Sequence, residues 1–212
     1  MSGHAVAAHA AASISAPQGL WLVSRASGLV LLVLFSAVVV VGVATRIGAM
    51  APGWPRFAVA ELHRTLSLFA VVLLGLHVAA ALLDPYVYIG WLAAVVPFTS
   101  HYEVLALGAG TLAVDIAGAV LITSLLRTRL GLRSWRAVHS LAYLAWPVAF
   151  VHAIRAAPYD QHLWWVVLTE WVSLIAVATA VLVRLIRRTW PDPDPRTPGT
   201  PGQRRLEPAR RR

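Results

Sequence analysis

The chain of 212 residues contains no cysteine and no lysine, and only 13% of its residues are charged. Without cysteine it cannot form disulfides, thiolate zinc sites, cysteine-ligated iron–sulfur clusters or the covalent attachment of a c-type haem. By contrast, 58% of the residues are hydrophobic. This balance is unsuited to a soluble domain of this length and predicts an integral membrane protein.

Five charge-poor segments are each long enough to cross a membrane, which takes about 20 apolar residues. They are 26–45, 65–83, 104–126, 137–154 and 163–183. We therefore predict an all-α integral membrane protein, a bundle of five transmembrane helices. A sixth apolar stretch, 85–100, is interrupted by Pro and Gly, so we predict an interfacial or re-entrant segment there. Asp115 and Glu170 lie within spans and are expected to face the bundle interior; for Asp115 we favour structural hydrogen bonding over a proton route.

The positive charges predict the orientation of the bundle. All 18 are arginines, which give a formal net charge of +9. They gather around the first loop, around the third loop and in the tail: Arg46, Arg56, Arg64; Arg127, Arg129, Arg133, Arg136; and nine from Arg184 onward. Positive loops stay in the cytoplasm, so we predict an external N-terminus and a cytoplasmic C-terminus.

This distribution also bears on partners and on domain boundaries. Basic residues beside spans indicate contact with the lipid bilayer, and no nucleic-acid partner is expected. We divide the chain into an external tail (1–19), a transmembrane domain (20–188) and a disordered, basic cytoplasmic tail (189–212), which is rich in Pro and Arg and poor in apolar residues.

Four histidines lie in two spans at nearly equal spacing, His63 and His77 in the second and His139 and His152 in the fourth. These two spans run in the same direction, so the pairs fall at matching depths, about 20 Å apart along each helix. Neutral imidazoles that face each other across a bundle can bind a haem iron from both sides. A single membrane histidine is often only a hydrogen-bonding core residue, but four at matched depths favour two haem layers.

The helical phase fits the second span better than the fourth. A step of 14 residues turns about 320°, which returns to nearly the same helix face, whereas a step of 13 residues turns only about 220°. Pro147 lies between His139 and His152. We therefore predict that this proline kinks or rephases the fourth helix.

The residues around these histidines resemble a known family. They are W-L-V-S-R-A-S-G-L-V (21–30), L-H-R-T-L-S-L (62–68), L-H-V-A-A-A-L-L-D-P-Y (76–86) and T-S-L-L-R-T-R-L-G-L-R-S-W-R-A-V-H-S-L-A-Y (123–143). Over about 20–186 the chain resembles bacterial ferric reductase-like transmembrane domain proteins. The same histidine spacing occurs in the membrane domains of NADPH oxidases and eukaryotic ferric reductases, where it binds two b-type haems. The haem-binding membrane subunit of the methionine sulfoxide reductase system is a further relative.

The resemblance implies two molecules of heme b, an iron-binding role for His63, His77, His139 and His152, and a place in the bacterial inner membrane. Arginines close to these ligands are candidates to pair with the haem propionates. They are Arg64, Arg136 and Arg155, the first two being equally explained as ordinary cytoplasmic flanks. The aromatic residues of the fourth span either pack on the porphyrin or fill the bundle: Tyr143, Trp146 and Phe150.

The electron donor and acceptor are expected to be separate molecules. The tail after Arg184 is too short for flavin and nicotinamide domains, and the one G-x-G, at Gly108 and Gly110, lies inside a span where it suits helix packing. We expect an oxidoreductase component that takes electrons from a flavoprotein or quinol donor and passes them to an external acceptor. The alternatives are a cytochrome b561-like quinol-linked carrier and a non-redox haem-binding scaffold or sensor.

Overall fold

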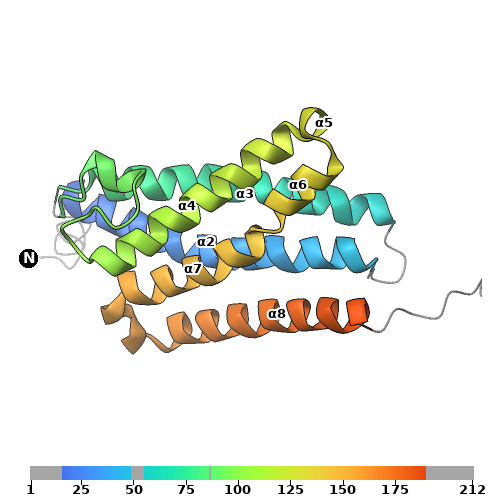
Figure 1. Ribbon diagram of the computed structural model, residues 1–212. Helices are drawn as coiled ribbons and strands as arrows, with labels where there is room; N and C mark the ends of the chain where they lie inside the picture. The colour runs from blue at the N-terminus through green and yellow to red at the C-terminus, as the bar shows by residue number, and fades with distance from the viewer. Residues whose placement is uncertain (1–15, 49–54, 86, 190–212) are drawn as a thin grey trace, which may run out of the picture.

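The computed structural model describes residues 16–48, 55–85 and 87–189 (Figure 1). Most of the two predicted tails, 1–19 and 189–212, lies outside these ranges, as does most of the loop between the first two spans.

The described chain is built from long helices joined by short turns. The long elements are α2 (Ala16–Ile47), α3 (Arg56–Leu83), α4 (Val104–Leu125), α6 (Leu132–His139) with α7 (Ala142–Ala156), and α8 (Trp164–Thr189). The short ones are η1 (Trp91–Ala94), α5 (Arg127–Leu130) and η2 (Pro158–His162). Five segments of the described chain are long and apolar enough to cross a membrane, α6 and α7 together forming one of them. The predicted five-span, multi-pass membrane protein is confirmed.

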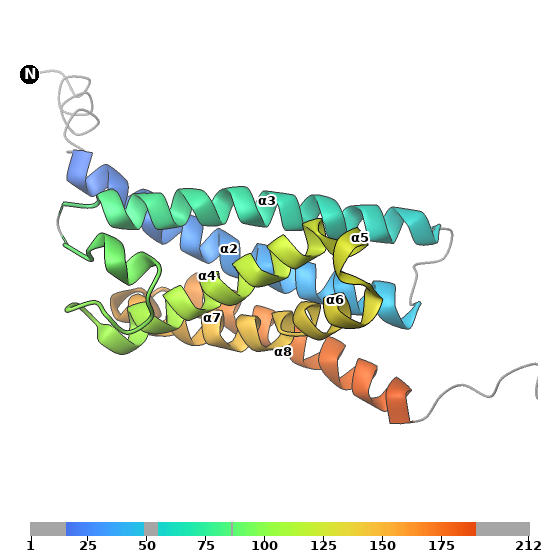
Figure 2. The ribbon, with the colours of Figure 1, turned by 45° about the horizontal axis from the view of Figure 1, so that its top comes forward.

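The helices lie side by side, with η1 and η2 at one end of the bundle and α5 at the other (Figures 1 and 2). We call these the η end and the α5 end. Helix α2 is central and packs on α3, α7 and α8, whereas α4 packs on α6 and α7. Helix α3 packs mainly on α2. The bundle therefore has two walls, α2 with α3 and α4 with α6 and α7.

The packed core joins α2, α7 and α8 on the side of α2 away from α3. Its buried centre is Val39, Trp146 and Val177. The indole Nε1–H of Trp146 donates to the Ser36 hydroxyl at 2.9 Å, and the ring stacks on Phe150 with centroids 5.2 Å apart. We predicted that Trp146 and Phe150 either pack on the porphyrin or fill the bundle, and in the structure they fill the bundle.

The fourth span is not one continuous helix, because α6 ends at His139 and α7 begins at Ala142. Three backbone N–H groups here donate to the carbonyl three residues earlier: Leu141 to Val138, Tyr143 to Ser140, and Leu144 to Leu141. Pro147 follows this stretch and offers no N–H to the carbonyl of Tyr143. Each 3₁₀ residue turns about 120° instead of about 100°, so about four or five of them raise the rotation from His139 to His152 from about 220° to about 300–320°. The predicted rephasing is present, and it precedes the proline.

The apolar stretch 85–100 does not cross the bundle. It forms η1 and a loop that covers the η end of α4, where the Thr111 hydroxyl donates to the Ala93 carbonyl at 2.6 Å. Gly108 lies against the ring of Phe98, so closely that any side chain at this glycine would overlap the ring. Gly108 therefore serves packing, as its position inside a span predicted.

The two acids within spans occupy different surroundings. Glu170 on α8 is buried, with 6% of its surface exposed, and accepts a hydrogen bond from Gln161 Nε2 at 3.0 Å. Asp115 lies near the middle of α4 on the exposed surface, and it makes no hydrogen bond or ion pair to any residue that the structure describes. The expected interior position is confirmed for Glu170 and wrong for Asp115, because the inner face of α4 is taken by small residues that line the space beside α7.

Replacing each acid by leucine tests this contrast. Glu170→Leu removes a buried hydrogen-bond acceptor and leaves Gln161 without its partner, so it should lower the free energy of unfolding by about 1–3 kcal/mol. Asp115→Leu breaks no contact within the chain and should leave thermal stability unchanged or raise it. Circular dichroism during heating in detergent measures both. A loss for Asp115→Leu as large as that for Glu170→Leu would contradict the structure.

Candidate functional site

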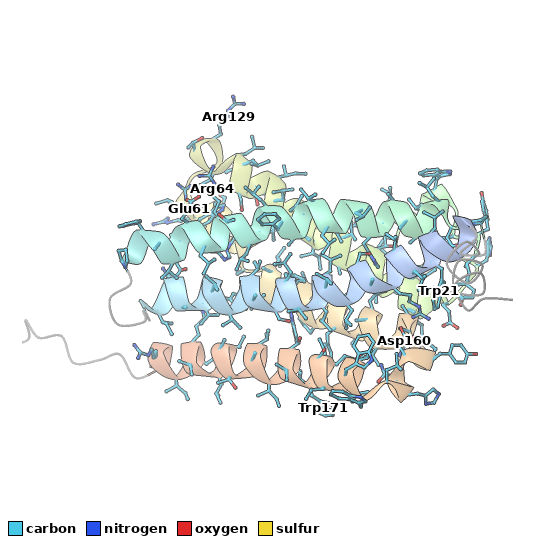
Figure 3. All side chains as sticks on the ribbon, turned by 180° about the vertical axis from the view of Figure 1, so that it is seen from behind. Trp21, Glu61, Arg64, Arg129, Asp160 and Trp171 are labelled. Atoms are coloured by element: carbon cyan, nitrogen blue, oxygen red, sulfur yellow. The ribbon has the colours of Figure 1, made fainter. Side chains whose placement is uncertain are left out.

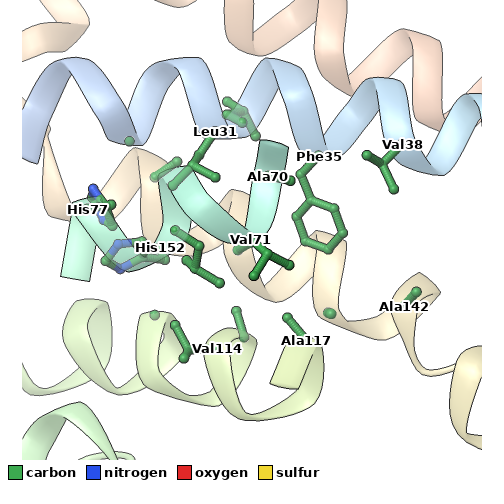
Figure 4. A pocket seen from close by; sticks show the side chains of 18 of the residues that line it. Leu31, Phe35, Val38, Ala70, Val71, His77, Val114, Ala117, Ala142 and His152 are labelled. Carbon is green, nitrogen blue, oxygen red and sulfur yellow. The ribbon is translucent and has the colours of Figure 1, made fainter. Parts of the chain in front are cut away.

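The four histidines meet as two pairs inside the bundle. His63 of α3 lies beside His139 at the end of α6, with ring centroids 6.3 Å apart and ring planes at 72°. His77 of α3 lies beside His152 of α7 at 6.2 Å and 81° (Figure 4). The predicted pairing of like depths is present, the first pair towards the α5 end and the second towards the η end.

The separation within each pair suits one metal ion held between the two rings. A metal–imidazole bond is about 2.0–2.1 Å long and the bound nitrogen lies about 1.1 Å from its ring centre, so two opposed ligands place their centroids about 6.2–6.4 Å apart. The observed 6.3 and 6.2 Å agree with this arrangement. The centroid separations therefore match those of two imidazoles that share one metal ion.

Each ligand ring is oriented by a contact at its Nδ1 atom. Three of them meet a backbone carbonyl: His63 and Val38 at 3.1 Å, His77 and Ser24 at 2.9 Å, His152 and Ala106 at 2.8 Å. A carbonyl oxygen only accepts, so Nδ1 must carry the proton in all three rings. The neutral ring then keeps its lone pair on Nε2, the atom that is left to bind a metal.

The fourth ring reaches the same state through a serine. Ser124 Oγ lies 3.4 Å from His139 Nδ1, and its own proton goes to the Val120 carbonyl at 2.6 Å. The hydroxyl oxygen therefore accepts, both from His139 and from the indole Nε1–H of Trp135 at 3.3 Å. All four histidines are consequently held with Nε2 available.

Small residues on the neighbouring helices make room for the rings. A Cβ atom at Gly28 would lie 3.0 Å from Cε1 of His77, one at Gly42 would lie 3.0 Å from Cε1 of His63, and one at Gly110 would lie 2.7 Å from His152. Gly28 and Gly42 are 14 residues apart, like His63 and His77 on the antiparallel α3. Gly110 and Ser124 repeat this interval on α4. Sequence reasoning missed the role of these glycines, although the shared interval of 14 residues was visible.

All four histidines line one cavity of about 1760 Å³ between the two walls. A pocket for one drug-sized ligand takes about 300–1,000 Å³, so this space suits two large, flat ligands. Between the histidine pairs its lining is apolar, with Leu31 and Phe35 of α2 opposite Val114 and Ala117 of α4 (Figure 4). Phe35 lies midway along α2 between Gly28 and Gly42.

The donor set indicates what kind of metal group fits. Among the described residues no three His, Cys, Asp or Glu side chains gather as a ligand cluster. From the described residues, each site therefore offers two imidazoles. A porphyrin would complete such a site, because it supplies the other ligands of its own iron.

The arginines proposed as propionate partners differ in position. Arg64 and Arg136 line the cavity at the α5 end and are exposed, Arg64 also lying 3.9 Å from Glu61. Arg155 is exposed and is not among the residues that line the cavity. Arg25, which sequence reasoning left aside, lines the cavity at the η end (Figure 3 shows its partner Asp160).

Arg25 is held in place by two contacts. Its Nη1 donates to the Ala156 carbonyl at 3.0 Å and lies 3.4 Å from the Asp160 carboxylate. These contacts tie α2 to the turn between α7 and α8, close to the His77 and His152 pair.

A family model described as the ferric reductase like transmembrane component matches residues 27–150, more than half of the chain. The chain belongs to this family. Ferric reductase-like membrane domains generally bind haem and act in membrane electron transfer. The match includes His63, His77 and His139 and ends two residues before His152. No curated protein and no solved structure matches the chain.

The contact between Gly110 and His152 gives a prediction with a control on the same helix. Gly110→Ala places a methyl group against the His152 ring, which is held by its hydrogen bond to the Ala106 carbonyl. Overpacking of this kind costs about 1–3 kcal/mol. Gly118 has open space around its Cβ position, so Gly118→Ala should be neutral or stabilise α4 by about 0.5–1 kcal/mol. Thermal unfolding in detergent compares the two. Equal effects would show that the histidine contact is unimportant.

Proposed function

We propose that this protein is a di-haem b-type membrane cytochrome, the membrane component of a reductase system. The observation that carries the proposal is the two facing histidine pairs in one cavity, each at the separation that a shared iron requires. Membership of the ferric reductase-like family supports it. His63 and His139 would hold one haem, and His77 and His152 the other.

The arrangement of the ligands favours electron transfer over catalysis at the metal. A haem iron supplies reversible one-electron oxidation and reduction. Two histidine ligands at each site would leave no coordination position open for a substrate. The Nδ1 hydrogen bonds keep the rings from turning, and the apolar walls keep water from the space between the pairs. The protein's part is therefore to hold two redox centres in fixed positions.

The two pairs span most of the membrane. Along α3 they are separated by 14 residues, about 20 Å of helix. The cavity is continuous between them, and Phe35 extends into its middle from α2 (Figure 4). An electron that enters at one pair can thus reach the other without leaving the bundle.

Sidedness and partners complete the proposal. The α5 end is cytoplasmic and the η end external in a bacterial inner membrane, which puts the N-terminus outside and the C-terminus inside. A flavoprotein or quinol gives electrons to the His63 and His139 haem, and an external acceptor takes them from the other. Arg64 and Arg136 would balance propionate charge at the α5 end, and Arg25 would do so at the η end. Arg155, which does not line the cavity, stays a candidate from the sequence alone.

Ligand substitution tests the haem assignment. The purified protein should hold two haems per chain with the absorption spectrum of six-coordinate, low-spin iron. His77→Ala or His152→Ala should remove about half of the haem, and His63→Ala or His139→Ala the other half. His101→Ala, in the loop before α4, is the control and should leave the haem content unchanged. Unchanged content in all four ligand variants would remove the proposal.

Reporter fusions test the orientation. A reporter after Arg188 and one within 127–135 should be active on the cytoplasmic side, whereas one within 86–100 should be active outside. We expect this orientation because the loops at the α5 end are rich in arginine, and arginine-rich loops stay in the cytoplasm. An external C-terminus would reverse the two haem positions.

A further inference from the structure

The α5 end carries an exposed, strongly basic surface. We name it the basic face and define it by Arg127, Arg129, Arg133 and Arg136, all exposed. The stretch 126–140 that contains them has no Asp or Glu. Figure 3 shows Arg129 projecting outward from this end of the bundle. Among the described residues the nearby acid is Glu61, which is already beside Arg64.

Leucines lie between these arginines. Leu130 is 40% exposed and Leu132 is 59% exposed. Apolar side chains surrounded by charge of one sign are typical of a protein-docking surface, in which the apolar residues form the centre and the charges the rim. The charge of the basic face calls for an acidic partner.

One aromatic residue connects the basic face with the haem ligand beneath it. The ring of Trp135, half-buried, stacks on the ring of His139 with centroids 5.0 Å apart and planes at 29°. The Arg127 guanidinium also lies over this indole, 5.8 Å from its centre. Trp135 also reaches His139 through the Ser124 hydroxyl. Two contacts thus join this tryptophan to one ligand.

We propose that the basic face is the docking surface for an acidic electron-donor protein and that Trp135 conducts the electron from that donor to His139. The proposal rests on the di-haem function given above and names where its donor binds. Contact with anionic lipid would need the arginines alone. It would give no reason for a tryptophan stacked between the surface and the ligand.

The electron transfer would break or form no bond in this chain and move no proton. One electron leaves the reduced flavin of the donor, which is oxidised. A haem held by His63 and His139 would accept this electron, so the flavin would lose one electron and the haem would gain one. Trp135 provides the pathway and is unchanged at the end.

The docking test uses the full-length holoprotein in nanodiscs of zwitterionic phosphatidylcholine, with flavodoxin, a small acidic flavoprotein, as the probe. Arg129→Glu with Arg133→Glu should weaken flavodoxin binding at least about tenfold at low ionic strength, and the difference should shrink as salt is added. Arg187→Glu, the same charge change at the end of α8, should stay within about twofold. Flavodoxin binding is measured without electron transfer, and haem content is measured separately. Failure of the docking surface can therefore be distinguished from failure of the di-haem function.

Two outcomes overturn the docking surface. The first is flavodoxin binding that is weak in the unaltered protein or equal in all variants while two haems are present. The second is an effect of the arginine changes that occurs only in anionic lipid, which would assign the basic face to the membrane surface. A protein without haem that still shows the charge-dependent binding would retain the surface and remove the di-haem function.

The role of Trp135 is tested by the rate of haem reduction after mixing with reduced flavodoxin. Trp135→Leu should slow this rate about tenfold or more with unchanged flavodoxin affinity and haem content. Trp135→Phe keeps a stacked ring and should stay within about threefold. Reduction by duroquinol, a small neutral reductant, should be unaffected in both variants. Equal rates for Leu and Phe, or loss of haem in both, would show that Trp135 is only structural.

Discussion

The hydrogen bond at Nδ1 of each of the four half-buried histidines is the interaction on which the rest of the bundle depends. It decides the tautomer, and thereby leaves Nε2 as the atom that can bind a metal. It also needs a carbonyl or hydroxyl within about 3 Å, which only a closely packed neighbouring helix can supply. The glycines on α2 and α4 follow from this requirement, since a larger residue would push the ring away from its acceptor. Helix α2 thus contributes no ligand, yet it orients both ligands of α3.

The number and the extent of the spans were predictable because a hydrocarbon core sets a length and an apolar composition that any sequence must meet. The pairing of His63 with His139 and of His77 with His152 was also predictable, since spans that run in the same direction align residues by depth. Helix phase is harder, because it depends on a few backbone hydrogen bonds. The tight turns at Ser140 to Leu144 lie before Pro147, and their position depends on local packing.

The placement of polar side chains around the helices escaped prediction. Asp115 and Glu170 look alike in the sequence, each a lone acid in an apolar segment. Their surroundings differ because α8 turns Glu170 towards α2 and Gln161, whereas α4 uses its inner face for the cavity. Arg25 and Arg155 likewise both lie near the η end, and only Arg25 lines the cavity, where it is paired with Asp160. Such choices depend on helix rotation, which composition does not determine.

The division of the bundle into two walls has a consequence for how the protein is assembled. Helix α3 packs mainly on α2, and its inner side faces the cavity instead of another helix. If the cavity holds two haems as proposed, these cofactors are what joins α3 to the opposite wall. Cofactor loading would then be the last step of maturation, with α3 as the movable side through which it occurs. A chain that failed to receive its cofactors would then keep a helix, α3, whose main packing partner is α2 alone.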